Sequence, residues 1–332
     1  MNTATYSEEL GDSGQRRKDT AMPLLRRRGD YSAAMPLPEG AAEHLRWDNP
    51  YLLELVRRYA QVESPLNTHT QWRDSHRSDL DLRYFRGDNC YVRQLSNYSC
   101  TLEESLVRYA DYLRAFDARG LLGRLAEGGE FGCWTAEDGK GGLLSRDLLD
   151  SVNEISFLDR AWDLYGRRGA TVLDVGAGYG RLGCRMVEAV EGLGRYYCVD
   201  AVPESTFVCS YYLGYRGVSR KAVTVPLDRL ATLERTRIDL AVNIHGFSEM
   251  PYSAIGAWLE WLAARNVRHL FIISNTQDRL FSREHTVRGR NAAPLLWRCG
   301  YRRIAAEPIV RDPSLGDDLG VDDHFLLYEL QR

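Results

Sequence analysis

The segment ATVLDVGAGYGRLG, residues 170–183, has the residue types and spacing that most clearly suggest chemistry. An apolar run ends at Asp174 and passes directly into Gly176, Gly178 and Gly180. Glycine permits a backbone with positive φ and lets a ligand approach the main chain closely. The pattern therefore predicts a strand, a tight turn and a helix whose amino end suits an anionic group.

Two classes of ligand fit such a turn. Gly178, Gly180 and Gly183 have the G-x-G-x-x-G spacing of dinucleotide sites, which bind a pyrophosphate. Asp174, however, places a carboxylate two residues before the first glycine, where it attracts an ammonium group and repels a pyrophosphate. Asp200 closes the next apolar run, RYYCVD, and can accept hydrogen bonds from ribose hydroxyls of either ligand. Asp174 thus favours S-adenosylmethionine, and NAD is the distant alternative.

The next two apolar runs supply further candidates for the cofactor site. Asp228 follows AVTVP and can accept a hydrogen bond from an adenine amino group, or else cap a helix. Asn243 contacts the cofactor or is a satisfied amide inside the sheet. The complete predicted cofactor site comprises Asp174, Gly176, Ala177, Gly178, Gly180, Arg181, Asp200, Ala201, Leu227, Asp228 and Asn243.

Candidates for proton transfer lie in NIHGFSEMP, after the fourth apolar run. A hydroxyl that accepts a methyl group must lose a proton, and an imidazole titrates near working pH. His245 is therefore the first candidate for general base, with a turn histidine bonded to backbone as the alternative. Glu249 is a rival base, a partner that orients the imidazole, or an acid that stabilises the next helix. Because hard carboxylate ligands are few there, we expect no metal.

Two segments are expected to contact the substrate. Tyr91 and Arg93 lie in the aromatic and polar stretch 72–99, and His285 lies in the long aperiodic segment 274–294. Long loops in compact domains are often functional. Aromatic faces stack on sugar rings and on flat molecules alike, so they do not select an acceptor. Core packing and a plain surface loop are the alternatives.

The elements that must position these residues follow from hydrophobic periodicity. Helical spacing at 51–60 and 101–116, and a helix that starts near Leu148, predict a mostly helical first part. From residue 170, short apolar runs alternate with amphipathic segments, which is typical of a parallel sheet with helices on both faces. The predicted strands are 171–175, 195–200, 222–226, 239–245, 269–275, 301–309 and 323–330. The predicted parts are a flexible tail at 1–40, a helical substrate cap at 41–150 and a cofactor-binding domain at 151–332.

Length and charge place the chain among ordinary globular proteins. Its 332 residues are 44% hydrophobic, and 43 basic against 46 acidic residues give a net charge of −3. This even balance argues against a nucleic-acid partner. The sequence has no apolar run of membrane-spanning length and no secretion signal at its start. We therefore expect a cytoplasmic protein with a small-molecule substrate, no membrane partner, and possible assembly as a homo-oligomer.

VLDVGAGYGRLG and the acid of CVD resemble motifs one and two of the class I S-adenosylmethionine-dependent methyltransferases, over roughly the C-terminal half. LLSRDLLDSVNEISFL and NIHGFSEMP are similar to a bacterial family of sugar O-methyltransferases. The resemblance implies a Rossmann-like, doubly wound α/β fold with a seven-stranded methyltransferase sheet. It also implies S-adenosylmethionine as cofactor and methyl transfer to a hydroxyl of a sugar or glycosylated natural product. The alternatives are transfer to O, N or C of a non-sugar acceptor, and a cyclase that retains the cofactor without methyl transfer.

Overall fold

The computed structural model of this chain describes residues 37–69, 72, 80–92, 94, 100–285 and 288–331. Of the predicted tail, residues 1–36 lie outside the described residues, as does Arg93.

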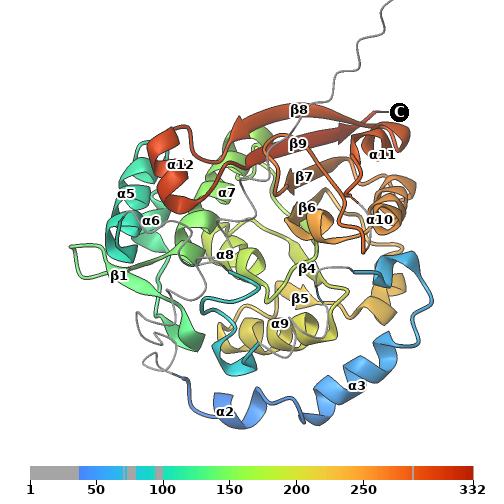
Figure 1. The fold of residues 1–332 in the computed structure, drawn as a ribbon, viewed down its shortest axis with the longest axis horizontal. Helices are drawn as coiled ribbons and strands as arrows, with labels where there is room; N and C mark the ends of the chain where they lie inside the picture. The colour runs from blue at the N-terminus through green and yellow to red at the C-terminus, as the bar shows by residue number, and fades with distance from the viewer. Residues whose placement is uncertain are drawn as a thin grey trace, which may run out of the picture.

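A seven-stranded sheet forms the centre of the protein (Figure 1), with strand order β5-β4-β3-β6-β7-β9-β8. Strands β3 to β7 are parallel, and β9 runs antiparallel to both of its neighbours. The predicted α/β, doubly wound fold is confirmed. The strand bounds are β3 Thr171–Val175, β4 Arg195–Val199, β5 Ala222–Thr224, β6 Leu240–Ile244, β7 His269–Ile273, β8 Tyr301–Pro308 and β9 His324–Leu330.

The order in which successive strands are added to the sheet changes direction between β3 and β6. Strands β4 and β5 lie on one side of β3, whereas β6 pairs with its other side, with Asp174 opposite Val242. In open α/β sheets the crevice at such a switch point, beyond the carboxyl ends of the strands, is where ligands bind. The glycine turn and the segment after β6 meet at this crevice.

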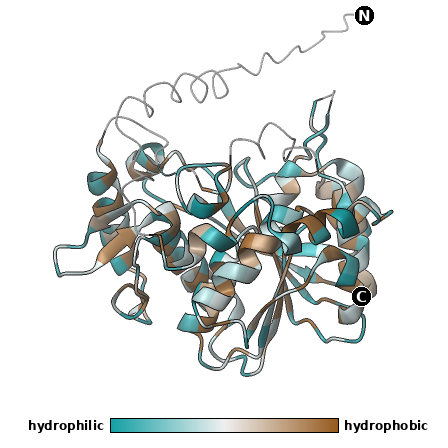
Figure 2. Ribbon diagram, turned by 90° about the horizontal axis from the view of Figure 1, so that it is seen from below, coloured by the Kyte–Doolittle hydropathy of each residue, from teal (hydrophilic) through white to brown (hydrophobic). Residues whose placement is uncertain are grey.

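Helices follow the strands where amphipathic segments predict them. Helices α8 and α9 pack on β4 and β5, and Phe157 of α7 stacks on Phe271 of β7 and Phe325 of β9. In Figure 2 the strands are coloured largely as hydrophobic and lie among helices of mixed colour. The helix bounds are α7 Arg146–Trp162, α8 Arg181–Ala189, α9 Pro203–Tyr215, α10 Tyr252–Ala264, α11 Ala293–Arg298 and α12 Pro313–Leu319, with 3-10 helices η5 Leu227–Leu233 and η6 Gly246–Glu249.

The described residues before α7 form short helices, 3-10 helices and a two-stranded sheet, so helices cover less of this part than the sequence predicts. Helix α3 begins after the N-cap Asn49, with Pro50 at its first position, and packs on α9. Helix α5 begins with a capping box between Thr101 and Glu104 and packs on α7. Residue 150, the predicted end of the cap, falls inside the continuous helix α7. The elements are α2 Ala41–His44, α3 Pro50–Tyr59, η2 Pro65–Asn67, η3 Leu82–Tyr84, α5 Leu102–Arg114, α6 Leu121–Arg124, η4 Glu130–Gly132, β1 Thr135–Glu137 and β2 Leu143–Ser145.

None of the helices in the described part of the chain combines the length and the apolar character that a membrane span needs.

Candidate functional site

The glycine turn at the carboxyl end of β3 has the predicted strand–turn–helix form. The N–H groups of Gly176 and Ala177 donate to the carbonyl oxygen of Val199 at 2.8 and 3.1 Å, which holds the turn against β4. Gly180 has a φ of +84° and precedes α8, and a Cβ there would lie 2.8 Å from Cys209 Sγ. Only glycine fits this position without displacement, so the turn keeps its main chain close to the crevice.

Asp200 lies directly after β4 and holds the glycine turn from the other side. Its Oδ2 accepts from the N–H of Gly178 at 2.9 Å, and its Oδ1 accepts from the N–H of Val202 at 2.8 Å. Burial raises the pKa of Asp200 to about 7, against the effect of these hydrogen bonds. A carboxylate has about four acceptor positions, so this contact leaves acceptor capacity for the predicted ribose.

Asp174 is the buried carboxyl group nearest in sequence to the turn. It is 4% exposed, and the Tyr196 hydroxyl donates to its Oδ2 at 2.8 Å. Burial raises the pKa of Asp174 to about 7. Within the described residues Asp174 forms no ion pair, so a ligand that brings an ammonium group would supply the missing opposite charge.

Arg181, the first residue of α8, is already paired inside the protein. Its guanidinium donates to both carboxylate oxygens of Glu154 at 2.8 and 2.7 Å and to Ser151 Oγ at 2.9 Å. Burial raises the pKa of Glu154 to about 7, and Arg181 opposes that rise. Glu154 was not predicted as a site residue. Its signal in the sequence is an acid on a helix face of α7 that is otherwise buried and largely apolar.

Asp228, predicted to recognise adenine, and Leu227, predicted as a further residue of the cofactor site, are both hydrogen-bonded to helix α3. Arg58 donates to both carboxylate oxygens of Asp228, with Nε–Oδ2 at 2.9 Å and Nη2–Oδ1 at 2.7 Å. The N–H of Leu227 donates to the Tyr59 hydroxyl at 2.8 Å, and that hydroxyl also bonds Thr206 Oγ1. Asp228 is not an N-cap either, because η5 begins at Leu227. The polar groups of this pair thus have protein partners that the sequence prediction did not include.

Asn243, at the end of β6, uses both polar atoms of its amide within the protein. Its Nδ2 donates to the carbonyl oxygen of Val175 at 2.7 Å, and its Oδ1 accepts from the N–H of Phe247 at 2.8 Å. This arrangement corresponds to the alternative that Asn243 is an interior amide whose hydrogen bonds are all made within the protein. It joins the end of β3 to η6 and so fixes the two walls of the crevice relative to each other.

His245 sits at the entrance to η6 in a left-handed conformation, with a φ of +60°. Burial lowers the pKa of its imidazole to about 4, and the Asn275 side chain works against that shift. Among the described residues no group forms a hydrogen bond with its buried Nδ1. The charges that act on it are those of Arg181, Asp150 and Arg146. The imidazole is therefore neutral at physiological pH and a weak base.

Glu249, at the end of η6, has the pKa that a general base needs. Burial raises the pKa of its carboxyl group to about 7, while the indole N–H of Trp72 donates to its Oε2 at 3.0 Å. Asp200 raises this pKa further and Arg283 lowers it. Glu249 is thus within electrostatic reach of Asp200, the acid that follows β4 and holds the glycine turn.

Tyr91 and Trp72 bridge the crevice from the glycine turn to Glu249. Tyr91 Cδ1 lies 3.4 Å from where a Cβ of Gly178 would be, and its hydroxyl shares a hydrogen bond with Ser205 Oγ at 3.0 Å. The Trp72 ring is tilted against the Tyr91 ring, with centroids 4.8 Å apart. Tyr91 therefore covers the glycine turn, whereas the sequence prediction assigned it to the substrate.

The segment that follows β7 reaches the same region. The N–H of Arg283 donates to the carbonyl oxygen of Met250 at 2.8 Å, which brings this segment next to Glu249. His285, two residues later, is exposed. Its predicted contact with the substrate remains a prediction.

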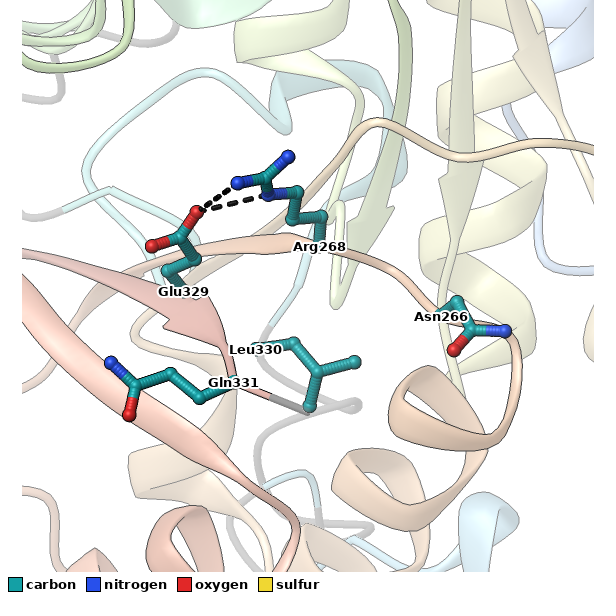
Figure 3. Close-up of a pocket in the computed structure, with 5 residues that line it drawn as sticks. All are labelled: Asn266, Arg268, Glu329, Leu330 and Gln331. Atoms are coloured by element: carbon teal, nitrogen blue, oxygen red, sulfur yellow. Dashed lines mark hydrogen bonds and ion pairs between the residues drawn. The ribbon is translucent and has the colours of Figure 1, made fainter.

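The hollow drawn in Figure 3 lies away from this crevice. Its lining residues are Asn266, Arg268, Glu329, Leu330 and Gln331, with an ion pair between Arg268 and Glu329 at 2.7 Å. Arg268 precedes β7, so the hollow lies at the amino edge of the parallel strands, opposite the glycine turn. A second, open hollow lies between α3 and η5 and is lined partly by Arg58, Val62 and Asp228.

One group of metal-ligand residues occurs in the described part of the chain, at Glu127, Cys133 and Asp147. Both carboxylates already face guanidinium groups, since Arg86 pairs with each of them and Arg185 pairs with Glu127. These positive charges balance the carboxylates in place of a metal ion.

The chain matches no family model and no curated protein. Among solved structures it is similar to mitomycin 7-O-methyltransferase, with 20% identity, 59% of each chain covered and a TM-score of 0.41. It is also similar to the magnesium protoporphyrin IX methyltransferase of Synechocystis PCC 6803, with 13% identity over 56% of this chain and 86% of that chain, and a TM-score of 0.39. It is similar as well to a tRNA methyltransferase of B. subtilis, with 14% identity over 52% of this chain and 65% of that chain, and a TM-score of 0.37. The chain spans about 59% of the length of the first of these proteins, and the likeness is too distant to carry functional meaning.

Proposed function

We propose that this chain is an S-adenosylmethionine-dependent methyltransferase that methylates a hydroxyl group of a sugar or glycosylated natural product without a metal. The observation that carries the proposal is a buried Asp174 before the glycine turn, which forms no ion pair with any described residue, together with Asp200, which accepts a hydrogen bond from the turn. A buried carboxyl group and a half-buried one at the switch point suit a ligand with an ammonium group and a ribose. They oppose a pyrophosphate, which places two negative charges at such a turn.

The residues present fit the proposed cofactor. Asp174 would face its ammonium group, Asp200 its ribose, and the amino end of α8 its carboxylate. The cofactor supplies an electrophilic methyl group when it is bound. The protein must then hold the acceptor oxygen in line with that group, exclude water and remove one proton.

Glu249 is the better-matched proton acceptor of the two candidates. A general base works best when its pKa lies near working pH, and the pKa of Glu249 is raised by burial to about 7 whereas that of His245 is lowered to about 4. The Trp72 N–H fixes the orientation of the Glu249 carboxylate. We therefore assign proton removal to Glu249 and a neutral, hydrogen-bonding role to His245, reversing the order expected from the sequence.

Binding of S-adenosylhomocysteine tests the cofactor assignment. We expect it to raise the melting temperature of the protein, and NAD to leave it unchanged. Asp174→Asn should weaken binding roughly tenfold to a hundredfold, because it removes a charge-assisted hydrogen bond. Asp111→Asn, at a surface acid with a 63% exposed side chain, is the matched control. Stabilisation by NAD, or by neither ligand, would refute the assignment.

Arg58→Ala tests whether Asp228 belongs to the adenine site. If adenine binds there, Arg58 competes for the same carboxylate. Its removal should then tighten binding of S-adenosylhomocysteine about fivefold, since a net hydrogen bond is worth about 1 kcal/mol. The neighbouring Arg57→Ala, which breaks only a surface pair with Glu54, should leave the dissociation constant unchanged. Equal affinity in both variants, measured by calorimetry, would exclude Asp228 from the site.

Methyl-labelled cofactor distinguishes the acceptor classes. Incubation with sugars, glycosides and aglycones, followed by mass spectrometry, should give a methylated glycoside under the main proposal. A labelled aglycone would favour the non-sugar alternative. Cofactor binding without any transfer of label would favour the cyclase.

A further inference from the structure

Beneath the glycine turn lies a fully buried centre of two guanidinium and two carboxylate groups, called here the paired-arginine centre. It consists of Arg86, Glu127, Asp147 and Arg185, and each of the four side chains is at most 1% exposed. Arg86 Nη2 and Arg185 Nη2 each donate to Glu127 Oε2 at 2.8 Å, and Arg86 Nε donates to Asp147 Oδ2 at 2.9 Å. The two guanidinium charges offset the two carboxylate charges within the centre.

Asp147 joins this centre to the glycine turn. The hydroxyl of Tyr179, the residue between Gly178 and Gly180, donates to Asp147 Oδ2 at 2.5 Å. Tyr179 is 3% exposed, and its ring contacts those of Phe85 and Tyr212. The turn is thus anchored through the side chain of its central residue as well as through its main chain.

Arg86 joins the same carboxylate to the loop that carries Tyr91. The backbone carbonyl of Arg86 accepts from Gln94 Nε2 at 3.0 Å, and the Asn89 side chain accepts from the N–H of Tyr91 at 2.8 Å. These bonds give the loop a defined shape between Arg86 and Tyr91. The ring of Tyr91 then lies on Gly178.

We propose that Asp147 is a positioning residue for the cofactor cleft, because its single carboxylate fixes both walls of that cleft. It holds the glycine turn through Tyr179 and the Tyr91 loop through Arg86, and so sets the spacing between Tyr91 and Gly178. Charge-assisted hydrogen bonds in a water-free interior are short and directional, which suits them to this role. The inference rests on the proposed function, since the ligand for which the spacing is set is S-adenosylmethionine.

Tyr179→Phe isolates this effect, because it keeps the ring packing and removes only the hydroxyl that Asp147 accepts. We expect the dissociation constant of S-adenosylhomocysteine to rise roughly tenfold, with a melting temperature within a few degrees of wild type. At saturating cofactor, kcat should stay within about twofold. Tyr212→Phe is the matched control: this tyrosine lies in the same aromatic cluster, but its hydroxyl bonds Arg216. Its cofactor affinity should equal that of wild type.

Asp147→Asn provides a second variant. If it folds, its loss of affinity should be at least that of Tyr179→Phe, and the double variant should lose no more than Asp147→Asn alone. If it does not fold, Tyr179→Phe decides the question. Equal affinities of Tyr179→Phe and Tyr212→Phe would overturn the inference while the proposed function stands. A wild-type protein that binds no S-adenosylhomocysteine would overturn both.

Discussion

Glu249→Gln lowers methyl-transfer turnover by a factor of roughly 10² to 10⁴, the range that general-base catalysis contributes. The amide keeps the size of the side chain and its hydrogen bond from Trp72, but it cannot take up a proton from the acceptor hydroxyl. Cofactor affinity should change little, because the turn and Asp174 are untouched. Single-turnover transfer of labelled methyl, at saturating cofactor, measures the effect.

The pH profile separates Glu249 from His245. A base acts when it is deprotonated, so the wild-type kcat at saturating cofactor, where Asp174 and Asp200 are occupied, should rise as pH rises through about 7, the raised pKa of Glu249. Glu249→Gln should lose this limb, and His245→Ala should keep it, because the imidazole pKa lies near 4. A Glu249→Gln variant that keeps both the rate and the limb contradicts the assignment.

Arg185→Met destabilises the protein by roughly 3 to 5 kcal/mol, the typical effect of breaking a buried ion pair. Arg185 is fully buried, and it donates to Glu127 Oε2 and to the Ala126 carbonyl oxygen at 2.8 and 2.7 Å. Its removal leaves a buried carboxylate with less positive charge around it. Urea unfolding followed by circular dichroism measures the change in the free energy of unfolding.

Two further variants serve as comparisons for the effect of Arg185→Met on stability. Arg237→Met removes a surface pair with Asp239, in which the arginine side chain is 90% exposed, and should change the free energy of unfolding by less than about 1 kcal/mol. Combining Arg185→Met with Glu127→Gln should recover part of the loss, because the unpaired charge is then absent. An Arg185→Met variant as stable as Arg237→Met would mean that the centre contributes nothing to stability.

The inner strands were predictable because they are buried and largely apolar, whereas the edge strand β8, YRRIAAEP, is mostly exposed or half-buried. Each of the seven predicted runs contains a strand, and the differences lie at the ends. The run 222–226 is shortened to Ala222–Thr224, just before Pro226, which cannot donate a ladder hydrogen bond. The run 195–200 ends at Val199, because Asp200 turns to bind the N–H groups of the neighbouring loops.

The site was predictable only where its residues are close in sequence. Asp174 and the glycines lie together because strand, turn and helix are consecutive, and Asp200 follows from the pairing of adjacent strands. Partners that lie far apart left no local signal. Arg58 and Asp228 are 170 residues apart, and Arg86 and Asp147 are 61 apart. Hydrophobic periodicity predicts which face of a helix or strand is buried. It does not predict which charged side chains of different elements form ion pairs, so these contacts were missed.

The unbroken run of α7 through residue 150 bears on how the protein folds. This helix contributes Asp147 to the paired-arginine centre and Phe157 to the sheet, so it belongs to both halves of the molecule. Cleavage of the chain at that point would expose surface that is buried in each half. It would also separate buried charged groups from their partners, which water cannot replace. We therefore expect the helical portion and the sheet to unfold as one cooperative unit.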